Sequence, residues 1–226
     1  MKCYITLVVC LLIANTLLAQ ATKCCVPMEN GNDTSLWYKW SKENTAKIGL
    51  EDLILTSDSL HFRFSTETQS VDIWTNDFKT FSGFLIIYTN SVPENYNGKI
   101  KGKLYSKKIM LDSSTAKNVY LLFNDHSVFS IPPQENIKGW KNGFDGDIFL
   151  IEYSTPSNYS FKSYWTPSAY PNIKEAVIID TLTKQLNKIL VLHNRWSKFI
   201  DSLPKGCYTA GGAGIACSIT IENKKK

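Results

Sequence analysis

One stretch of the sequence keeps a long helical period of apolar residues, between positions 172 and 203. Seven side chains follow one another at alternating steps of four and three, which places them on one helical face: Leu182, Leu186, Ile189, His193, Trp196, Ile200 and Leu203. The start has two candidates. Asn172 with Glu175 matches a capping box, whereas residues 176–179 could form a short strand with Asp180 as the helix cap. We favour the second, because a helix from residue 173 to residue 203 would be about 46 Å long, which is longer than a compact domain of this size needs. The pattern therefore predicts a helix over about 181–203, which ends before Pro204.

The chain before this helix is patterned as strands and turns. Residues 60–64 and 159–165 alternate in the manner of partly covered strands, and three continuous apolar runs fit central strands: 83–88, 119–123 and 148–153. Turn-forming residues separate these runs at a spacing of about ten. We therefore predict a mainly β fold with one long C-terminal α-helix, in which an antiparallel meander forms a barrel or sandwich and the helix packs on the sheet.

The first 21 residues have the pattern of a secretory signal peptide. Lys2 provides the positive charge, residues 4–18 the apolar run, and Ala19-Gln20-Ala21 the cleavage site. No later segment is apolar for long enough to cross a bilayer. We expect residues 1–21 to be removed and residues 22–226 to form a single secreted β-rich domain, extracellular and without a membrane span.

Secretion changes the interpretation of the cysteines. Outside the signal segment there are four, at Cys24, Cys25, Cys207 and Cys217. An even number in an oxidising compartment predicts two disulfides. Because a bond between the neighbours Cys24 and Cys25 would close a strained ring, we expect each of them to pair with Cys207 or Cys217. Either arrangement ties the two ends of the domain together.

Two tripeptides match the acceptor for N-linked glycans, at Asn32 and at Asn158. Asn32 lies in a polar, turn-like stretch. Asn158 precedes a predicted strand, so its use depends on whether it lies in the turn.

The clearest charged feature is a row of lysines at Lys99, Lys101, Lys103 and Lys107. In a strand these side chains point to one face, about 7 Å apart. Such a row could bind a polyanionic glycan, an anionic lipid surface or an acidic protein. The alternative, which we favour, is a solvated face or an edge strand that lysines protect from aggregation.

Little in the sequence points to catalysis or to a cofactor. Serine-hydrolase, zinc-protease, phosphate-binding and dinucleotide-binding motifs are missing, so we expect no cofactor and no metal. Of the three histidines, His61 alternates with phenylalanines, His193 takes a core position of the helix, and His126 lies in a turn-like tetrapeptide and is the best candidate for a site. A net charge of +5 is too mild to indicate a nucleic-acid binder.

Two functions from different classes follow. The first is a secreted extracellular binding protein, without catalysis, for a small apolar ligand or a partner protein. The second is a secreted hydrolase whose residues are scattered along the chain. A signal peptide, a β-meander, a late helix and a terminal disulfide resemble the plan of lipocalins in architecture only, because Trp37 and Trp40 lack the G-x-W pattern of that family.

Overall fold

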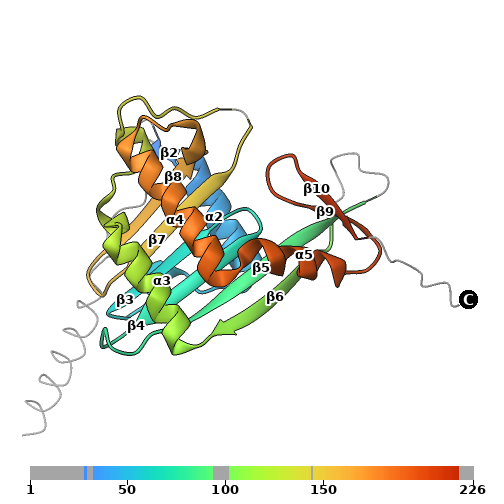
Figure 1. The fold of residues 1–226 in the computed structure, drawn as a ribbon, viewed down its shortest axis with the longest axis horizontal. Coiled ribbons are helices and arrows are strands. Elements are labelled where there is room, and N and C mark those ends of the chain that lie inside the picture. Colours follow the sequence, from blue (N-terminus) through green and yellow to red (C-terminus); the bar gives the residue numbers. More distant parts are fainter. Residues whose placement is uncertain (1–27, 30–32, 94–101, 144, 219–226) are drawn as a thin grey trace, which may run out of the picture.

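The computed structural model describes residues 28–29, 33–93, 102–143 and 145–218. They form a mixed α/β structure in which one open antiparallel sheet carries helices on both faces (Figure 1). The helices are α2 (Leu36–Lys47), α3 (Ser113–Asp125), α4 (Lys174–Leu190) and α5 (Leu192–Asp201). The strands of the sheet are β3 (Leu60–Ser65), β4 (Gln69–Thr75), β5 (Ser82–Val92), β6 (Leu104–Leu111), β7 (Ile148–Ser154), β8 (Tyr159–Trp165), β9 (Gly206–Thr209) and β10 (Ile215–Ser218). A separate two-stranded ribbon pairs β1 (Met28–Glu29) with β2 (Asp33–Thr34).

The sheet does not close on itself. Its strands run in the order β6-β5-β4-β3-β7-β8, and the β9–β10 hairpin pairs with the far end of β5 at Ser91 and Val92. The predicted barrel or sandwich is therefore wrong. The prediction of an antiparallel, β-rich sheet with a helix packed on it is confirmed, but "mainly β with one long helix" understates the four helices of the described residues.

The two faces of the sheet have separate cores, because neighbouring residues of a strand point to opposite sides. On one face Phe62 and Phe64 join the large core beneath α3 and α4, which Figure 1 shows side by side across the sheet. The other face is covered by α2, whose Tyr38 packs edge-on against Phe161 with ring centroids 5.2 Å apart. Both faces are thus buried, which explains why the central strands contain few exposed positions.

Two helices were missed in the sequence. The apolar run 119–123, predicted as a strand, lies inside α3. A run of five apolar residues fits a strand and a buried helix equally well, and the deciding signal is the cap: the side chain of Asp112 accepts a hydrogen bond from the Thr115 N–H at 2.8 Å. Helix α2 was missed because its apolar pattern is weak. Its buried residues are Tyr38, Ser41 and Thr45, and two of these three are polar.

The long C-terminal helix is two helices. It begins at Lys174, so the predicted strand at 176–179 is wrong, and it breaks at Val191, whose φ of 51° and ψ of 42° are left-handed. The break rotates the buried face. Ile189 and His193, predicted to face the core, are exposed, whereas Leu190, Leu192 and Phe199 are buried. Among the described helices, none is both long enough and apolar enough to cross a bilayer.

The disulfide pattern also differs from the prediction. Cys207 bonds to Cys217 across the β9–β10 hairpin, where the two residues are direct partners in the strand register and their Cα atoms lie 4.0 Å apart. A bond between the two ends of the domain through these cysteines is therefore excluded. Cys24 and Cys25 lie outside the described residues. Nine residues with three glycines separate Cys207 from Cys217, a length and composition that allow a hairpin and so bring these two cysteines together.

The left-handed residue at the helix break predicts the effect of a substitution there. A β-branched side chain in this conformation costs about 1–2 kcal/mol, and Val191 is 46% exposed, so its side chain adds little packing. We expect Val191→Gly to raise the free energy of unfolding by about 0.5–1 kcal/mol after the entropy cost of glycine. Urea denaturation would measure the change.

The matched control is Val177→Gly, at an exposed position inside α4 with ordinary helical geometry. There glycine should lower the stability by about 0.5–1 kcal/mol. Equal effects of the two substitutions would show that Val191 is not strained.

Candidate functional site

A pocket of about 480 Å³ opens where the helix break, the end of the sheet and the β9–β10 hairpin meet. We call it the hairpin pocket. Its walls are mostly apolar and include Phe64, Phe149, Leu192 and Trp196. Phe64 and Phe149 stack with ring centroids 5.9 Å apart and form a continuous aromatic wall. The pocket is a preformed concave surface of the kind that holds small molecules.

The helix break shapes one side of the hairpin pocket. The Gln69 side-chain amide of β4 donates to the Leu192 carbonyl at 3.0 Å, and the Asn187 side-chain oxygen accepts from the His193 N–H at 3.0 Å. The Asn187 bond holds an N–H of the first turn of α5, which has no partner within the helix, and the Gln69 bond ties that turn to the sheet. As a result the exposed ring of His193 and the half-buried ring of Trp196 both line the pocket.

The β9–β10 hairpin forms the opposite wall. The Thr89 hydroxyl of β5 donates to the Thr209 carbonyl at 2.6 Å, and the Gly212 N–H donates to the Glu67 carboxylate. Gly212 has a φ of 52°, which a glycine adopts without strain. Together with the Cys207–Cys217 bond, these contacts fix the hairpin beside the loop at residues 66–68. Gln69, Asn187 and Glu67 bind backbone groups, whereas Asp147, Lys184 and His193 supply a polar part of the lining beside the apolar wall.

A second feature is a row of charges that crosses the sheet on the face beneath α2. Arg63 of β3 is the register partner of Asp72 on β4 and of Glu152 on β7. The guanidinium binds both oxygens of Asp72, at 2.6 and 2.8 Å, and reaches Glu152 at 3.4 Å and the Glu51 carbonyl at 2.9 Å. All three side chains are at most 3% exposed. A forked pair of this kind is directional as well as strong.

Lys42 of α2 completes this charge row from above the sheet. Its ammonium lies 2.7 Å from Asp52 and 3.4 Å from Glu152, and 4.9 Å from the centre of the Tyr159 ring. Burial, and then the charge of Glu152, raise the pKa of the Tyr159 hydroxyl, whereas the pKa of Tyr38 is raised to about 12 by burial and by Asp52. These hydroxyls remain neutral at physiological pH. Every carboxylate of the row has a cation, which makes the row a structural element and leaves no spare group for chemistry.

The structure does not gather the predicted site residues into one place. His126 ends α3, where its Nε2 lies 3.2 Å from the Gln185 side-chain oxygen, with no acid recorded as its partner in the described part of the chain. Asn158 is exposed in the turn between β7 and β8, as use of that sequon requires. Lys103 and Lys107 are exposed at and within β6, an edge strand, which agrees with the protective role that we favoured.

Several predicted features fall on residues that the structure does not describe. These are the segment 1–21, Cys24, Cys25, Asn32, Lys99 and Lys101. Groups of three or more His, Cys, Asp or Glu side chains that could hold a metal ion are not found among the described residues.

The residues of the charge row were missed in the sequence, although a signal was present. Arg63 and Asp72 each stand at the centre of an alternating strand, on the side that single-sequence reasoning assigns to solvent. Only the presence of α2 on that side turns these positions into buried ones. The side chains that form the hairpin pocket come from segments more than 120 residues apart, so no local motif could have identified it.

Comparisons with known proteins do not add a family. The sequence matches no protein-family model, and no curated protein matches it significantly. The fold and the pocket geometry therefore carry the functional argument.

The charge row predicts a large loss of stability when one partner is removed. Arg63→Met would leave Asp72 buried without its cation and is expected to lower the free energy of unfolding by about 3–5 kcal/mol. Arg63→Met with Asp72→Leu should recover a large part of that loss, since Glu152 keeps Lys42. Lys47→Met, which breaks an exposed pair with Glu43, should cost at most about 0.5 kcal/mol. Urea denaturation of these proteins, with Asp72→Leu alone to complete the cycle, would show whether Arg63 and Asp72 are coupled.

The same pair predicts a pH dependence. Burial opposes the ionisation of Asp72, but the charge of Arg63 outweighs it and holds the pKa of Asp72 below its ordinary value of 3.8. A depressed pKa contributes stability that is present above the unfolded value and is lost as the pH falls. Between about pH 5 and pH 2 the wild type should therefore lose more stability than the Arg63→Met, Asp72→Leu protein. Parallel stability curves for the two proteins would contradict this assignment.

Proposed function

We propose that this chain is a secreted binding protein whose hairpin pocket holds a small, largely apolar ligand. The observation that carries the proposal is a preformed pocket of about 480 Å³ with largely apolar walls, in which the Gln69 and Asn187 side chains are already engaged with backbone groups. Such a surface gains affinity from the area that it removes from water, at roughly 25 cal/mol per Å². A ligand with one or two rings matches this volume.

The extracellular setting rests on two supports. The Cys207–Cys217 bond suits an oxidising compartment, and residues 1–21 have the composition of a secretory signal. The disulfide also has a place in the binding proposal, because it closes the hairpin that forms one wall of the hairpin pocket.

The hydrolase alternative has one observation in its favour, which is that His61 lies between Asp58 and Asp72 beside a second pocket. A histidine base, however, activates a hydroxyl or thiol through a hydrogen bond. In the described part of the chain, neither ring nitrogen of His61 has a hydrogen-bond partner. Binding is therefore the better supported function.

The proposal is tested with N-phenyl-1-naphthylamine, a neutral apolar fluorophore of two ring systems. We expect its fluorescence to rise on addition of the protein and to saturate with one site. Trp196→Ala removes an aromatic wall of the hairpin pocket and should weaken binding about tenfold or more. Thr183→Trp, which fills the hairpin pocket from α4, should abolish binding.

Leu55→Ala is the control, because Leu55 is 77% exposed and does not line the hairpin pocket. It should bind the fluorophore as the wild type does. Circular dichroism of each variant checks the fold. Undiminished binding by both folded pocket variants would refute this location.

A further inference from the structure

A second pocket, also of about 480 Å³, lies on the opposite face of the sheet, beside the charge row. We call it the His61 pocket. It shares no lining residue with the hairpin pocket. The residues that matter for its chemistry come from β3, β4, β5, β6 and the loop before β3: Asp58, His61, Asp72, Trp74, Phe84 and Lys108.

His61 lies between two carboxylates in this pocket without a hydrogen bond of regular geometry. Its side chain is 5% exposed, with Nδ1 at 3.2 Å from the Asp58 carboxylate and Nε2 at 3.7 Å from the Asp72 carboxylate. Neither nitrogen meets the geometry of a hydrogen bond, and both are buried. When this imidazole is neutral it has one N–H and one lone pair, so one of its nitrogens then turns a lone pair toward a carboxylate oxygen. In that state the arrangement has room for a further hydrogen-bond donor.

The carboxylates of Asp58 and Asp72 differ in the partners that they already have. Asp72 gives both oxygens to Arg63, so its charge is already balanced. Asp58 is 21% exposed, and its Oδ1 accepts one bond from the Asn76 amide at 3.0 Å. Its other oxygen, Oδ2, faces His61. Asp58 is therefore the carboxylate available to a ligand.

The pocket also has an aromatic wall. Trp74, the register partner of His61, lies 5.5 Å from it between ring centroids, and Phe84 lies 5.9 Å from Trp74. The Lys108 ammonium stands 3.6 Å above the centre of the Phe84 ring. A cation therefore already lies on the aromatic wall. The Lys108 side chain is exposed on the edge strand, and it is long enough to move away from the Phe84 ring into solvent.

Other ligand classes fit less well. An anion would face the carboxylates of Asp58 and Asp72. A metal ion is disfavoured because Asp72 already binds Arg63, and no group of three His, Cys, Asp or Glu side chains that could hold a metal is found among the described residues. An organic cation meets the Asp58 carboxylate, the His61 imidazole and two aromatic rings.

We propose that the His61 pocket binds a small primary ammonium ion that carries an aromatic ring. The ammonium donates to the Asp58 carboxylate and to a nitrogen of His61, and the ring packs against Trp74 and Phe84. The ligand displaces the ammonium of Lys108 from Phe84. This site does not depend on the hairpin pocket.

The test compares three ligands of similar size by isothermal titration calorimetry at pH 7: 2-phenylethylamine, 2-phenylethanol and 3-phenylpropionate. We expect the amine to bind with one site, the alcohol about tenfold more weakly, and the carboxylate not at all. Equal binding of all three, or a preference for the carboxylate, would overturn the proposal.

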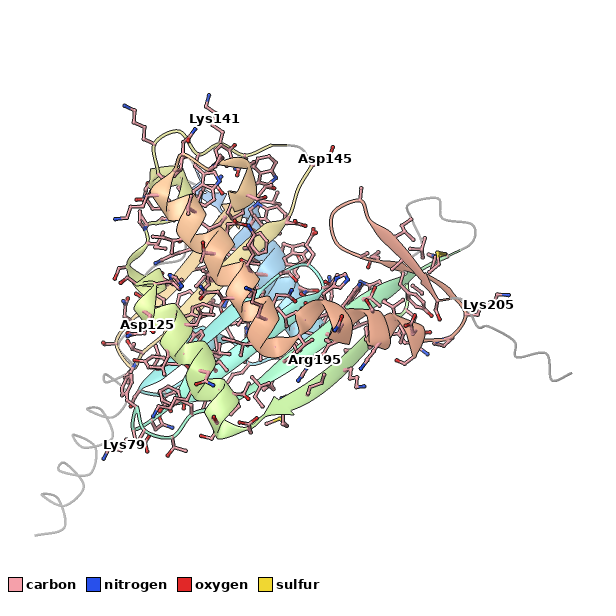
Figure 2. The ribbon with its side chains drawn as sticks, in the orientation of Figure 1. Lys79, Asp125, Lys141, Asp145, Arg195 and Lys205 are labelled. Carbon is pink, nitrogen blue, oxygen red and sulfur yellow. A yellow bond between two sulfur atoms is a disulfide. The ribbon has the colours of Figure 1, made fainter. Side chains whose placement is uncertain are left out.

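Variants locate the site. Asp58→Asn keeps the bond from Asn76 but removes the charge, and should weaken amine binding about tenfold or more. Lys108→Met removes the competing ammonium and should strengthen it severalfold. Asp125→Asn is the matched control, since Asp125 lies at the end of α3, away from the hairpin and outside both pockets (Figure 2).

Trp196→Ala separates the two proposals. It should leave amine binding unchanged although it weakens binding of the apolar fluorophore. If Trp196→Ala abolished amine binding, or if Asp58→Asn behaved like Asp125→Asn, the assignment to the His61 pocket would be wrong.

Discussion

The forked pair between Arg63 and Asp72, extended to Glu152, is the interaction on which the geometry of the sheet depends. It joins three neighbouring strands at positions that are direct register partners. A slip of one residue in β3 would move Arg63 to the face beneath α3 and α4, among Phe62, Phe64 and their neighbours, with no carboxylate to meet it. Apolar residues alone would not penalise such a slip strongly, because both faces of the sheet are buried. The charges therefore select the register, and in doing so they align the walls of both pockets.

The two pockets arise from different interruptions of regular structure. The hairpin pocket exists because α4 stops at Val191 and because β5 is long enough to carry β9 beyond the end of β4. The His61 pocket exists because α2 ends at Lys47 and leaves the polar end of that face uncovered. In both places strands of the sheet form the base of the pocket and less regular segments form its edge, an arrangement that many binding proteins use.

The sequence predicted some elements accurately and others poorly, for physical reasons. The strands at 60–64, 148–153 and 159–165 have strong patterns and adjacent turn residues, and the structure contains them almost as predicted. The run at 119–123 was ambiguous, and Val191 carries no sign of a helix break, because β-branched residues rarely adopt its conformation. Closure of a sheet depends on strand tilt and stagger, which a single sequence does not reveal. The pockets required knowledge of which helix covers which face.

An open sheet has outer strands whose backbone groups are available to other chains, and in the described residues these are β6, β8 and the short β10. The first two are protected in different ways. The edge strand β6 is protected by charge, because Lys107 and Lys108 repel another positively charged strand. The edge strand β8 is covered by the segment around Gln134, whose side-chain oxygen accepts a hydrogen bond from the Trp165 N–H. A carboxylate-rich extended peptide would neutralise the lysines of β6 but would not displace the segment that covers β8. Of these two edges, strand addition should therefore favour β6 and a polar partner.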